Sequence, residues 1–405
     1  MSQRVVIAGA GHAAGQVVAS LRQHKFDGQI VLVGDEPYLP YQRPPLSKKF
    51  LAGDMDAERL YVKPASFYED AGVELHLDSK ITAIDRENKR LRLAGNDDIA
   101  YDKLVLALGS RVRQLAVEGT ELKGVHYLRS IADVEGIRGD MEPGRRLVVI
   151  GAGYIGLEVA AVAQQAGLDV TVIEMADRVM SRVVSPEISD FYQIEHTNQG
   201  VRLRLSTSVT ALNGKKRVKS VTTSDGEDLR ADLVVIGVGI QPNTELATDA
   251  GLAVDDGVVV DNHCITSDPD IFAVGDCTSH PNAIYERQLR LESVHNALEQ
   301  AKTAAANICG GDVSYCEVPW FWSDQYDLKL QIAGLSEGHD DVVIRGNPAK
   351  RSFSCLYLAE GRLIAVDAIN APRDFVQSKQ LIADRAEIDA TKLADTEIAL
   401  KEMLA

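Results

Sequence analysis

The segment VVIGAGYIGLE, from Val148 to Glu158, is the most informative part of this 405-residue chain about its architecture. An apolar run leads into glycines at the spacing Gly-x-Gly-x-x-Gly, and a helical pattern follows. A dinucleotide-binding turn needs glycine where the chain turns tightly, where the backbone approaches pyrophosphate, and where the helix packs on the strand. Gly151, Gly153 and Gly156 occupy these three positions. The stretch therefore predicts a dinucleotide site between a strand and a helix.

A near-copy of this motif, VVIAGAGHAAG, stands near the start of the chain. Gly9, Gly11 and Ala14 take the same three positions there. In both copies the helix N-terminus would present N–H groups and a positive dipole end to phosphates. One such turn is weak evidence, because glycine-rich turns also serve packing. Two turns, each inside a complete strand–helix–strand unit, predict two dinucleotide sites.

Strand-like and helix-like segments alternate around both turns, which is typical of an α/β fold. In the first unit we expect strands at Arg4–Ala8 and Ile30–Val33 around a helix at Ala13–Gln23, and in the second unit strands at Leu147–Ile150 and Asp169–Ile173 around a helix at Ile155–Gln165. Further buried strands are expected within Asp102–Ser110, Ala231–Asn243 and Ser267–Cys277, and a long helix at Ser293–Asn307. From about Tyr315 the pattern alternates like antiparallel strands. The fold class is therefore α/β, with two Rossmann-like domains and a C-terminal α+β domain.

An acidic residue at the tip of the second strand completes each dinucleotide motif, because it accepts hydrogen bonds from ribose hydroxyls. Glu174 takes this position in the second unit and Asp35 in the first, with Glu36 expected as a solvated neighbour. A carboxylate repels a 2′-phosphate, and the nearest arginine is Arg178, so NADH is favoured over NADPH. Since FAD and NAD exchange hydride, we expect one bound flavin and one transient nicotinamide.

Composition excludes several other classes of protein. The formal net charge of −16 argues against a nucleic-acid partner. The longest apolar stretch, Leu147–Ala163, is broken by three glycines and Glu158, so no membrane span is expected. No removable leader is recognised ahead of the first strand, so we expect a cytoplasmic protein. The five cysteines are Cys264, Cys277, Cys309, Cys316 and Cys355, so none lies in the first 263 residues. They show neither a C-x-x-C pair nor metal-ligand spacing, so we expect neither a thiol relay nor a metal site.

Four further motifs occur in a fixed order with the two turns: LPYQRPPLSK, GYIGLEVA, DIFAVGDC and VPWFWSDQYDLKLQIAGLSEG. With them the chain resembles the NADH-dependent ferredoxin reductases of the putidaredoxin reductase type over nearly its whole length. The resemblance implies a glutathione-reductase-like fold. It implies an FAD domain at 1–112 and 241–315, an NADH domain at 113–240 and a C-terminal domain at 316–405.

The resemblance also implies a set of flavin contacts, for several of which the residue type gives a reason. Asp276 follows a strand and can accept from ribityl hydroxyls, and the Val294 amide opens a helix whose dipole would face the flavin. Arg43 supplies a cation for phosphate or flavin. The full set of FAD contacts that the resemblance implies is Ala13, Asp35, Arg43, Lys48, Ile81, Arg129, Asp276 and Val294. We also count Gly239 among the cofactor-binding residues. Trp320 and Trp322 are expected either to line the flavin exit or to belong to the core of the C-terminal domain.

Lys48 and Glu158 are the expected catalytic pair. The resemblance implies that the lysine of the PPLSK loop meets this glutamate beside the flavin N5 edge. Our hypothesis is that the pair orients the nicotinamide and stabilises charge on the reduced flavin, because a buried charge is tolerated when paired. The alternative for Glu158 is simple complementarity to the helix dipole. No acid–base catalyst is required, since hydride carries its own electrons.

The resemblance implies a two-iron two-sulfur ferredoxin as electron acceptor, which in turn serves a monooxygenase or a dioxygenase. A rubredoxin reductase differs only in its partner and stays open. An NADH oxidase or peroxidase typically has a cysteine where Gln42-Arg43-Pro44 stands, and a signalling flavoprotein akin to apoptosis-inducing factor would carry a targeting segment and a basic surface. Monomer and homodimer both stay open. Candidate basic residues for docking an acidic ferredoxin are Lys48, Lys49, Arg287, Arg290, Lys329, Lys350 and Arg351.

Overall fold

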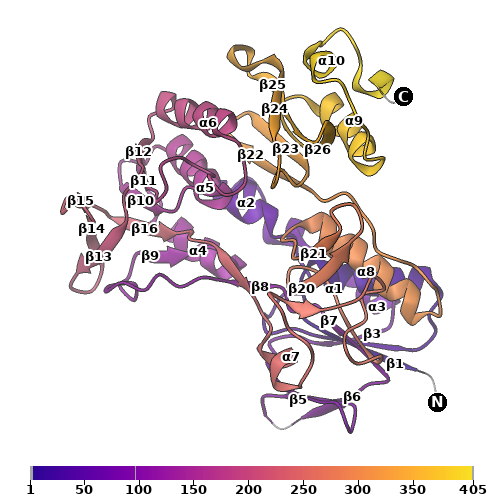
Figure 1. Cartoon of the computed structure of the whole chain (residues 1–405). Coiled ribbons are helices and arrows are strands. Elements are labelled where there is room, and N and C mark those ends of the chain that lie inside the picture. The colour runs from indigo at the N-terminus through magenta and orange to yellow at the C-terminus, as the bar shows by residue number, and fades with distance from the viewer. Residues whose placement is uncertain (1–2, 96, 404–405) are drawn as a thin grey trace. The chain divides into compact units, whose positions relative to one another are not determined.

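The computed structural model describes residues 3–95 and 97–403 (Figure 1). By their contacts these residues form two compact units. The first comprises the residues up to Arg43 together with Glu58–Arg111 and Gln241–Pro319. The second comprises Pro44–Ala57, Val112–Ile240 and the residues from Trp320 onward. The segment Pro44–Ala57, which lies inside the predicted FAD domain, therefore packs with the second unit, and the three-domain partition stays a prediction.

The first unit is built on a parallel five-stranded sheet in the order β19-β7-β1-β2-β3. Strand β1 pairs with β2 and β7, and all four pairings in the sheet are parallel. The strands are β1 (Arg4–Ala8), β2 (Gln29–Val33), β3 (Val73–His76), β7 (Lys103–Leu106) and β19 (Ile271–Ala273).

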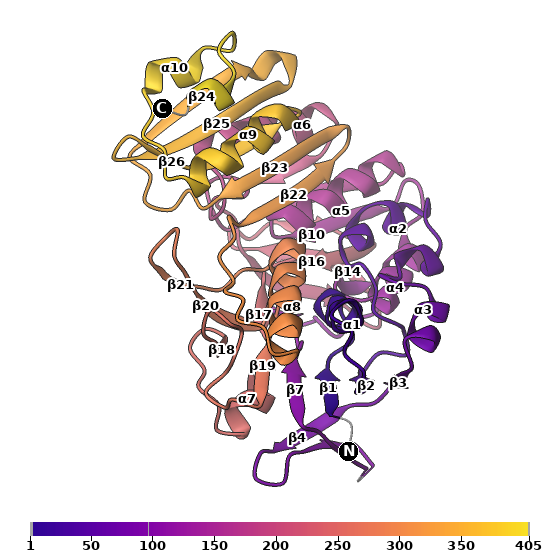
Figure 2. The ribbon, with the colours of Figure 1, turned by 90° about the vertical axis from the view of Figure 1, so that its right-hand side faces the viewer.

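Alternate residues of β1 enter two different cores, because successive side chains of a strand point to opposite faces. Val5 and Ile7 pack in one core with α1 (His12–Gln23) and α8 (Val294–Ile308). These two helices lie side by side in Figure 2. Val6 belongs to the core on the other face, which β4 (Ile81–Asp85), β5 (Arg90–Leu93) and β6 (Asp98–Ala100) help to form. Burial on both faces explains why the strand reads as an unbroken apolar run.

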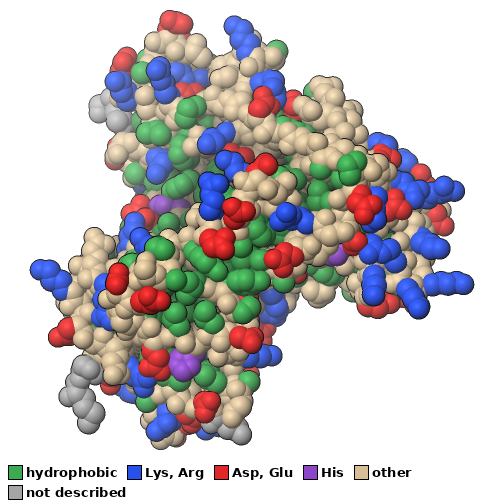
Figure 3. Space-filling model, turned by 180° about the vertical axis from the view of Figure 1, so that it is seen from behind, with side chains coloured by type: hydrophobic (Ala, Val, Ile, Leu, Met, Phe, Trp, Pro, Cys, Tyr) green, Lys and Arg blue, Asp and Glu red, His purple; other side chains and the backbone are tan. Residues whose placement is uncertain are grey.

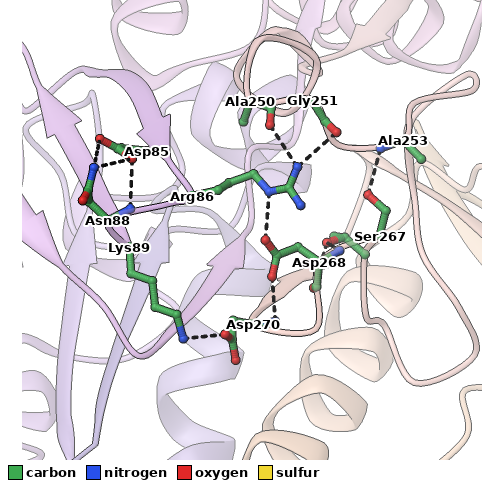
Figure 4. Close-up of polar contacts among 11 residues, drawn as sticks. Asp85, Arg86, Asn88, Lys89, Ala250, Gly251, Ala253, Ser267, Asp268 and Asp270 are labelled. Carbon is green, nitrogen blue, oxygen red and sulfur yellow. Dashed lines mark hydrogen bonds and ion pairs between the residues drawn. The ribbon is translucent and has the colours of Figure 1, made fainter.

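Arg86, directly after β4, connects this small sheet to the loops around residues 250 and 268 (Figure 4). Its guanidinium donates to Asp268 Oδ2 at 2.8 Å and to the carbonyl oxygens of Ala250 and Gly251 at 3.2 Å each. A hollow of about 680 Å³ lies beside it and is lined by charged side chains that include Asp85. These contacts hold the two loops in place. Arg86 and its partners lie outside the sequence motifs.

The other elements of the first unit are short. They are η2 (Ala57–Leu60), α3 (Ala65–Asp70), α7 (Glu245–Asp249), β18 (Val258–Val259), β20 (Thr278–Asn282) and β21 (Arg287–Leu289). Two of the places where the chain passes between the units lie within β8 (Ser110–Val112) and β17 (Ile240–Pro242), close to the buried strands expected within Asp102–Ser110 and Ala231–Asn243.

The second unit repeats the parallel arrangement, with strand order β12-β11-β10-β16-β9. Its core side chains, such as Val148 and Ile150, pack against the antiparallel sheet β13-β14-β15. The parallel strands are β9 (Val125–Tyr127), β10 (Arg146–Ile150), β11 (Asp169–Ile173), β12 (Arg202–Arg204) and β16 (Leu233–Ile236); the others are β13 (Val209–Gly214), β14 (Val218–Thr223) and β15 (Asp228–Arg230). The helices are η1 (Pro44–Ser47), α2 (Lys49–Ala52), α4 (Ile131–Asp140), α5 (Tyr154–Gln165) and α6 (Pro186–Asn198).

The C-terminal part of the second unit is an antiparallel sheet in the order β22-β23-β26-β25-β24, with α9 (Pro372–Ala383) across it (Figure 2). The strands are β22 (Trp320–Gln325), β23 (Leu328–Gly334), β24 (Asp341–Asn347), β25 (Ser352–Ala359) and β26 (Arg362–Ile369), followed by α10 (Ala390–Ala394) and η4 (Leu400–Met403), with η3 (Pro348–Lys350) between β24 and β25. The predicted fold class is confirmed. Among the described residues, no helix combines the length and apolar character that a bilayer crossing requires.

Candidate functional site

The glycine turn of the second unit has the geometry that a pyrophosphate site needs. Gly151 has φ +103°, and a Cβ added there would lie 2.4 Å from the carbonyl oxygen of Gly237. A Cβ on Gly156 would lie 2.0 Å from the oxygen of Gly151. At Gly153, apart from its chain neighbours, an added Cβ would meet no described atom within 4 Å. The outer glycines therefore serve packing, whereas Gly153 borders open space at the N-terminus of α5.

The first unit shows the same division of roles. Gly9 has φ +119°, and a Cβ there would lie 2.1 Å from the carbonyl oxygen of Ala107. Gly11 is the N-cap of α1, and a Cβ on it would meet no described atom within 4 Å beyond its chain neighbours. Ala14 is fully buried in the helix-side core, and Ala13 is buried beside it. Each turn thus leaves a cradle at its second glycine, which fits the diphosphate of a dinucleotide.

Several predicted flavin contacts of the first unit converge on this turn. A Cβ added to Gly275, the residue before Asp276, would lie 3.5 Å from Ala13 Cβ and 3.6 Å from Ala297 Cβ in the first turn of α8. Asp276 accepts a hydrogen bond from the Ser110 hydroxyl at 2.8 Å. Val294 begins α8, whose N-cap Ser293 accepts from the Asn296 amide. Two helix N-termini and one carboxylate therefore meet in a small region, and the flavin contacts themselves stay a prediction.

The acidic residues at the two strand tips have different surroundings. Glu174 accepts from the amides of Ala152 and Ala176 at 2.7 and 2.9 Å, which fixes its carboxylate beside the glycine turn. Asp35 is exposed. Glu36, expected to be solvated, is instead half-buried and accepts from Arg43 at 2.9 Å and from the Tyr41 hydroxyl at 2.6 Å. That expectation was wrong because Tyr41 and Arg43 of the following loop fold back onto Glu36 and supply it with donors.

Lys48 and Glu158 form an ion pair in the second unit, with Lys48 Nζ 2.7 Å from Glu158 Oε2. Glu158 lies on α5 and is only 1% exposed. Its Oε2 also accepts from the Ser47 hydroxyl at 2.5 Å, and its Oε1 accepts from the Ser323 hydroxyl at 2.6 Å. A carboxylate this deeply buried is stable when it is paired and fully hydrogen-bonded, and three donors meet that need here. The pairing predicted for Lys48 and Glu158 is thus present in the geometry.

The remaining predicted residues are divided between the units. Ile81 begins β4 in the first unit. Arg129 lies in the second unit, where its amide donates to Asp133 Oδ2 at the start of α4. Gly239 follows β16 with φ +106° and accepts from the Arg113 amide. Trp320 begins β22, and its ring contacts Trp322 and Phe375.

Three serines that donate to predicted carboxylates were missed by sequence reasoning. They are Ser47, Ser110 and Ser323, each of which donates its hydroxyl to a predicted carboxylate. Ser47 stands inside the PPLSK motif and Ser110 ends the run LALGS, so both were near positions already singled out. A small polar residue in the aromatic strand WFWSDQ was the signal for Ser323.

The buried cysteines Cys277 and Cys355 have the surroundings of structural thiols. Cys277, next to Asp276, is buried, and burial raises the pKa of its thiol to about 11. Burial likewise raises the pKa of Cys355 to about 12. A thiol with such a pKa is protonated at neutral pH and is a poor nucleophile.

Comparison with known proteins agrees with this geometry. A model of the pyridine nucleotide-disulphide oxidoreductase family matches residues 3–301, and a reductase C-terminal model matches residues 320–404. The ferredoxin–NAD(+) reductase component of the anthranilate 1,2-dioxygenase system of Burkholderia cepacia is 42% identical and covers 98% of each chain. The rubredoxin–NAD(+) reductase of Pseudomonas putida is 40% identical over 91% of this chain and 96% of its own.

A solved structure, that of the covalent putidaredoxin reductase–putidaredoxin complex, matches with a TM-score of 0.97 at 44% identity, over 99% of this chain and 98% of that one. The resemblance seen in the sequence is thereby confirmed. The chain is an oxidoreductase that uses FAD and NAD(H), as the two turns predicted. Its two glycine turns and the family match over residues 3–301 show that it belongs to the pyridine nucleotide-disulphide oxidoreductase family.

Proposed function

We propose that this chain is a ferredoxin reductase, which carries electrons from NADH through FAD to a two-iron two-sulfur ferredoxin that serves a monooxygenase or dioxygenase. The observation that carries the proposal is the pair of open glycine cradles at Gly11 and Gly153, one in each unit. Relatives named as ferredoxin–NAD(+) reductase and putidaredoxin reductase support the choice of acceptor.

In this proposal the first unit holds FAD and the segment 113–240 holds NADH. FAD, when bound, supplies the conversion of a two-electron hydride into electrons that leave one at a time. The chain's own residues bind and orient. The N-termini of α1 and α5 attract the diphosphates at Gly11 and Gly153, and Asp276 accepts from ribityl hydroxyls.

Lys48 and Glu158 are proposed to orient the nicotinamide, since the pair lies on the same unit as the NADH turn and Glu158 is on the helix that starts there. We also keep the hypothesis that the pair stabilises charge on the reduced flavin. Replacing Glu158 by Ala should slow the NADH-driven bleaching of the flavin in stopped flow. An unchanged rate would remove Glu158 from the mechanism.

The preference for NADH over NADPH is supported by the contacts of Arg178. Its guanidinium donates to the carbonyl oxygens of Ser181 and Val184 and to the Ser189 hydroxyl, all at 2.7 to 2.8 Å. These hydrogen bonds hold the Arg178 guanidinium against the loop before α6 and the first turn of that helix. A 2′-phosphate would instead meet the Glu174 carboxylate, which repels it.

The surface that a protein partner would meet carries both basic and acidic side chains. Figure 3 shows basic side chains interspersed with acidic ones on the face that it presents. Some of the candidate docking cations are already paired with carboxylates, since Arg290 bonds Asp256 and Arg351 bonds Asp327. We propose that an acidic ferredoxin is steered by a local basic patch, whose attraction reaches about 8 Å at physiological salt. The proposed location is the cytoplasm, with monomer and homodimer both open.

One experiment separates the candidate functions. The purified protein is mixed with NADH in stopped flow, and cytochrome c reduction is then followed with a two-iron two-sulfur ferredoxin, with a rubredoxin, and with neither. Ferredoxin-dependent turnover is the expected result. Equal or faster turnover with rubredoxin favours the rubredoxin reductase, and oxygen consumption without any carrier favours an oxidase. A protein that does not retain FAD refutes the proposal.

A further inference from the structure

Glu158 lies at the end of a chain of hydrogen bonds that is additional to its ion pair with Lys48. Ser323 Oγ accepts from Gln325 Nε2 at 3.2 Å, and Gln325 Oε1 lies 2.8 Å from His196 Nε2. His196 Nδ1 lies 3.2 Å from the Tyr326 hydroxyl. Ser323, Gln325 and His196 are buried as deeply as Glu158. The chain thus runs from α5 through β22 to α6, entirely within the second unit.

The orientation of the Gln325 amide gives the hydrogen bonds of this chain one consistent direction. Gln325 points its amide nitrogen at Ser323, so its carbonyl oxygen faces His196 and requires a proton on Nε2. Burial lowers the pKa of His196, which keeps the ring neutral and leaves Nδ1 to accept from Tyr326. An ionised carboxylate only accepts, so the Ser323 hydroxyl donates its proton to Glu158 while its oxygen accepts from Gln325. The reversed amide orientation would place the Gln325 oxygen beside Ser323, where it would compete with Glu158 for the hydroxyl proton.

Strand alternation explains how β22 presents these groups. Ser323 and Gln325 are two residues apart, so both side chains point to the same face of the strand. Between them lies Asp324, which faces the other way. Ser323, which donates to Glu158 on the helix of the NADH turn, and Gln325, which donates to Ser323, therefore both come from a strand of the C-terminal segment 320–404.

We propose that Ser323 is a positioning residue, which holds the Glu158 carboxylate in one orientation toward Lys48 and toward bound NADH, and that Gln325 and His196 lock the Ser323 hydroxyl for this task. The inference rests on the proposed function, since it assigns Glu158 a role in hydride transfer. A hydrogen bond to a charged group contributes enough that its loss should slow a step depending on that group by about tenfold.

The test uses the holoenzyme with Ser323→Ala, Glu158→Ala and the double variant, and Ser354→Ala as the matched control. Ser354 is also a buried serine of the C-terminal sheet and donates to a carboxylate, Asp374 Oδ2, at 3.0 Å. Stopped flow at saturating NADH gives the limiting rate of flavin reduction. Calorimetry with NAD⁺ gives the dissociation constant, and far-UV circular dichroism gives the thermal midpoint.

We expect S323A to lower the limiting rate about tenfold while the NAD⁺ dissociation constant stays within about twofold. The double variant should be no slower than E158A, because Ser323 acts through Glu158. S354A should keep the parent rate and lose a similar amount of thermal stability. If S323A unfolds, Gln325→Met, which keeps the Ser323 hydroxyl but removes the amide that contacts both Ser323 and His196, should give a smaller loss of about threefold that also disappears in the E158A background.

The proposal is overturned if S323A is reduced at the parent rate, if its effect multiplies with that of E158A, or if rate and NAD⁺ affinity fall together. Those results overturn this inference alone, provided that NADH reduces the parent protein. A parent that NADH does not reduce overturns the proposed function, and this inference with it.

Discussion

The second and third glycines of the NADH turn should respond in different ways to the same added methyl group. Gly153 and Gly156 are three residues apart, and Ala at either position adds one carbon. At Gly156 that carbon would lie 2.0 Å from the Gly151 oxygen, whereas at Gly153 it would meet no described atom within 4 Å beyond the chain neighbours. The first change therefore acts on packing and the second on the space left for a ligand.

The sizes of the two effects follow from these contacts. A normal carbon–oxygen contact is well over 3 Å, so Gly156→Ala forces α5 away from the turn by more than 1 Å; overpacking of this kind costs about 3 kcal/mol. Gly153 has φ −78° and ψ −177°, which any residue adopts, so Ala there costs about 1 kcal/mol for the poorer N-cap. Its methyl group, however, blocks amides that hold the diphosphate, which weakens binding about 10- to 100-fold.

Urea unfolding of the holoenzyme measures the first effect, and calorimetry with NAD⁺ measures the second. Gly11→Ala is the matched variant in the other unit, because its added Cβ also meets open space. It should weaken FAD retention and leave the NAD⁺ dissociation constant unchanged in protein that is reloaded with flavin. The three variants together separate packing from binding and one site from the other.

Two results would refute this reasoning. NAD⁺ affinity of G153A equal to that of the parent would mean that the diphosphate does not lie over Gly153. A G156A variant as stable as the parent would mean that the close approach of helix and turn is not required.

Three further predictions concern other parts of the molecule. Glu174→Gln removes the charge at the ribose end, so NAD⁺ should bind about tenfold more weakly and NADP⁺ more tightly in calorimetry; an unchanged preference contradicts the assignment. Burial raises the pKa of Asp367 to about 7, so its ionisation opposes folding: stability should fall by up to about 4 kcal/mol as pH rises from 4 to 7 and stay low above it. Asp367→Asn still accepts from Tyr357 and should abolish that slope in urea unfolding, whereas parallel stability curves would contradict the shift. Arg86→Met should cost about 2 kcal/mol through the lost bonds to Asp268 and two carbonyl oxygens without changing NAD⁺ affinity, and an unmoved urea midpoint would show that these bonds are dispensable.

The βαβ units could be predicted because their determinants are local. A buried parallel strand reads as an apolar run, and a glycine turn directly precedes each helix. The expected helices at Ala13 and Ile155 begin one residue earlier in the structure, at His12 and Tyr154. The strand Arg4–Ala8 agrees at both ends. Local pattern thus determines the elements, their order and the position of each cradle.

The contacts of the charged side chains could not be predicted in the same way. Glu36 was assigned to solvent because it follows a strand tip, yet its partners lie on the loop that Tyr41 and Arg43 belong to. Whether such a loop folds back depends on packing that no short window of sequence contains. The pairing of Lys48 with Glu158 was expected only from the resemblance, since the two are far apart along the chain.

Glu158 shows where counting donors goes further than pattern. A glutamate inside the apolar helix pattern GYIGLEVA is expected to be buried, and a buried carboxylate can accept about four hydrogen bonds. Lys48 alone leaves most of that capacity unfilled, so further donors had to exist. The sequence could indicate that need without locating the donors. Ser323 lies 165 positions away, on β22 of the antiparallel C-terminal sheet, whereas α5 follows a strand of the parallel sheet. Ser323 on β22 connects the C-terminal sheet to the carboxylate of the NADH-turn helix, so the chemistry proposed for α5 depends on a segment that carries no dinucleotide motif.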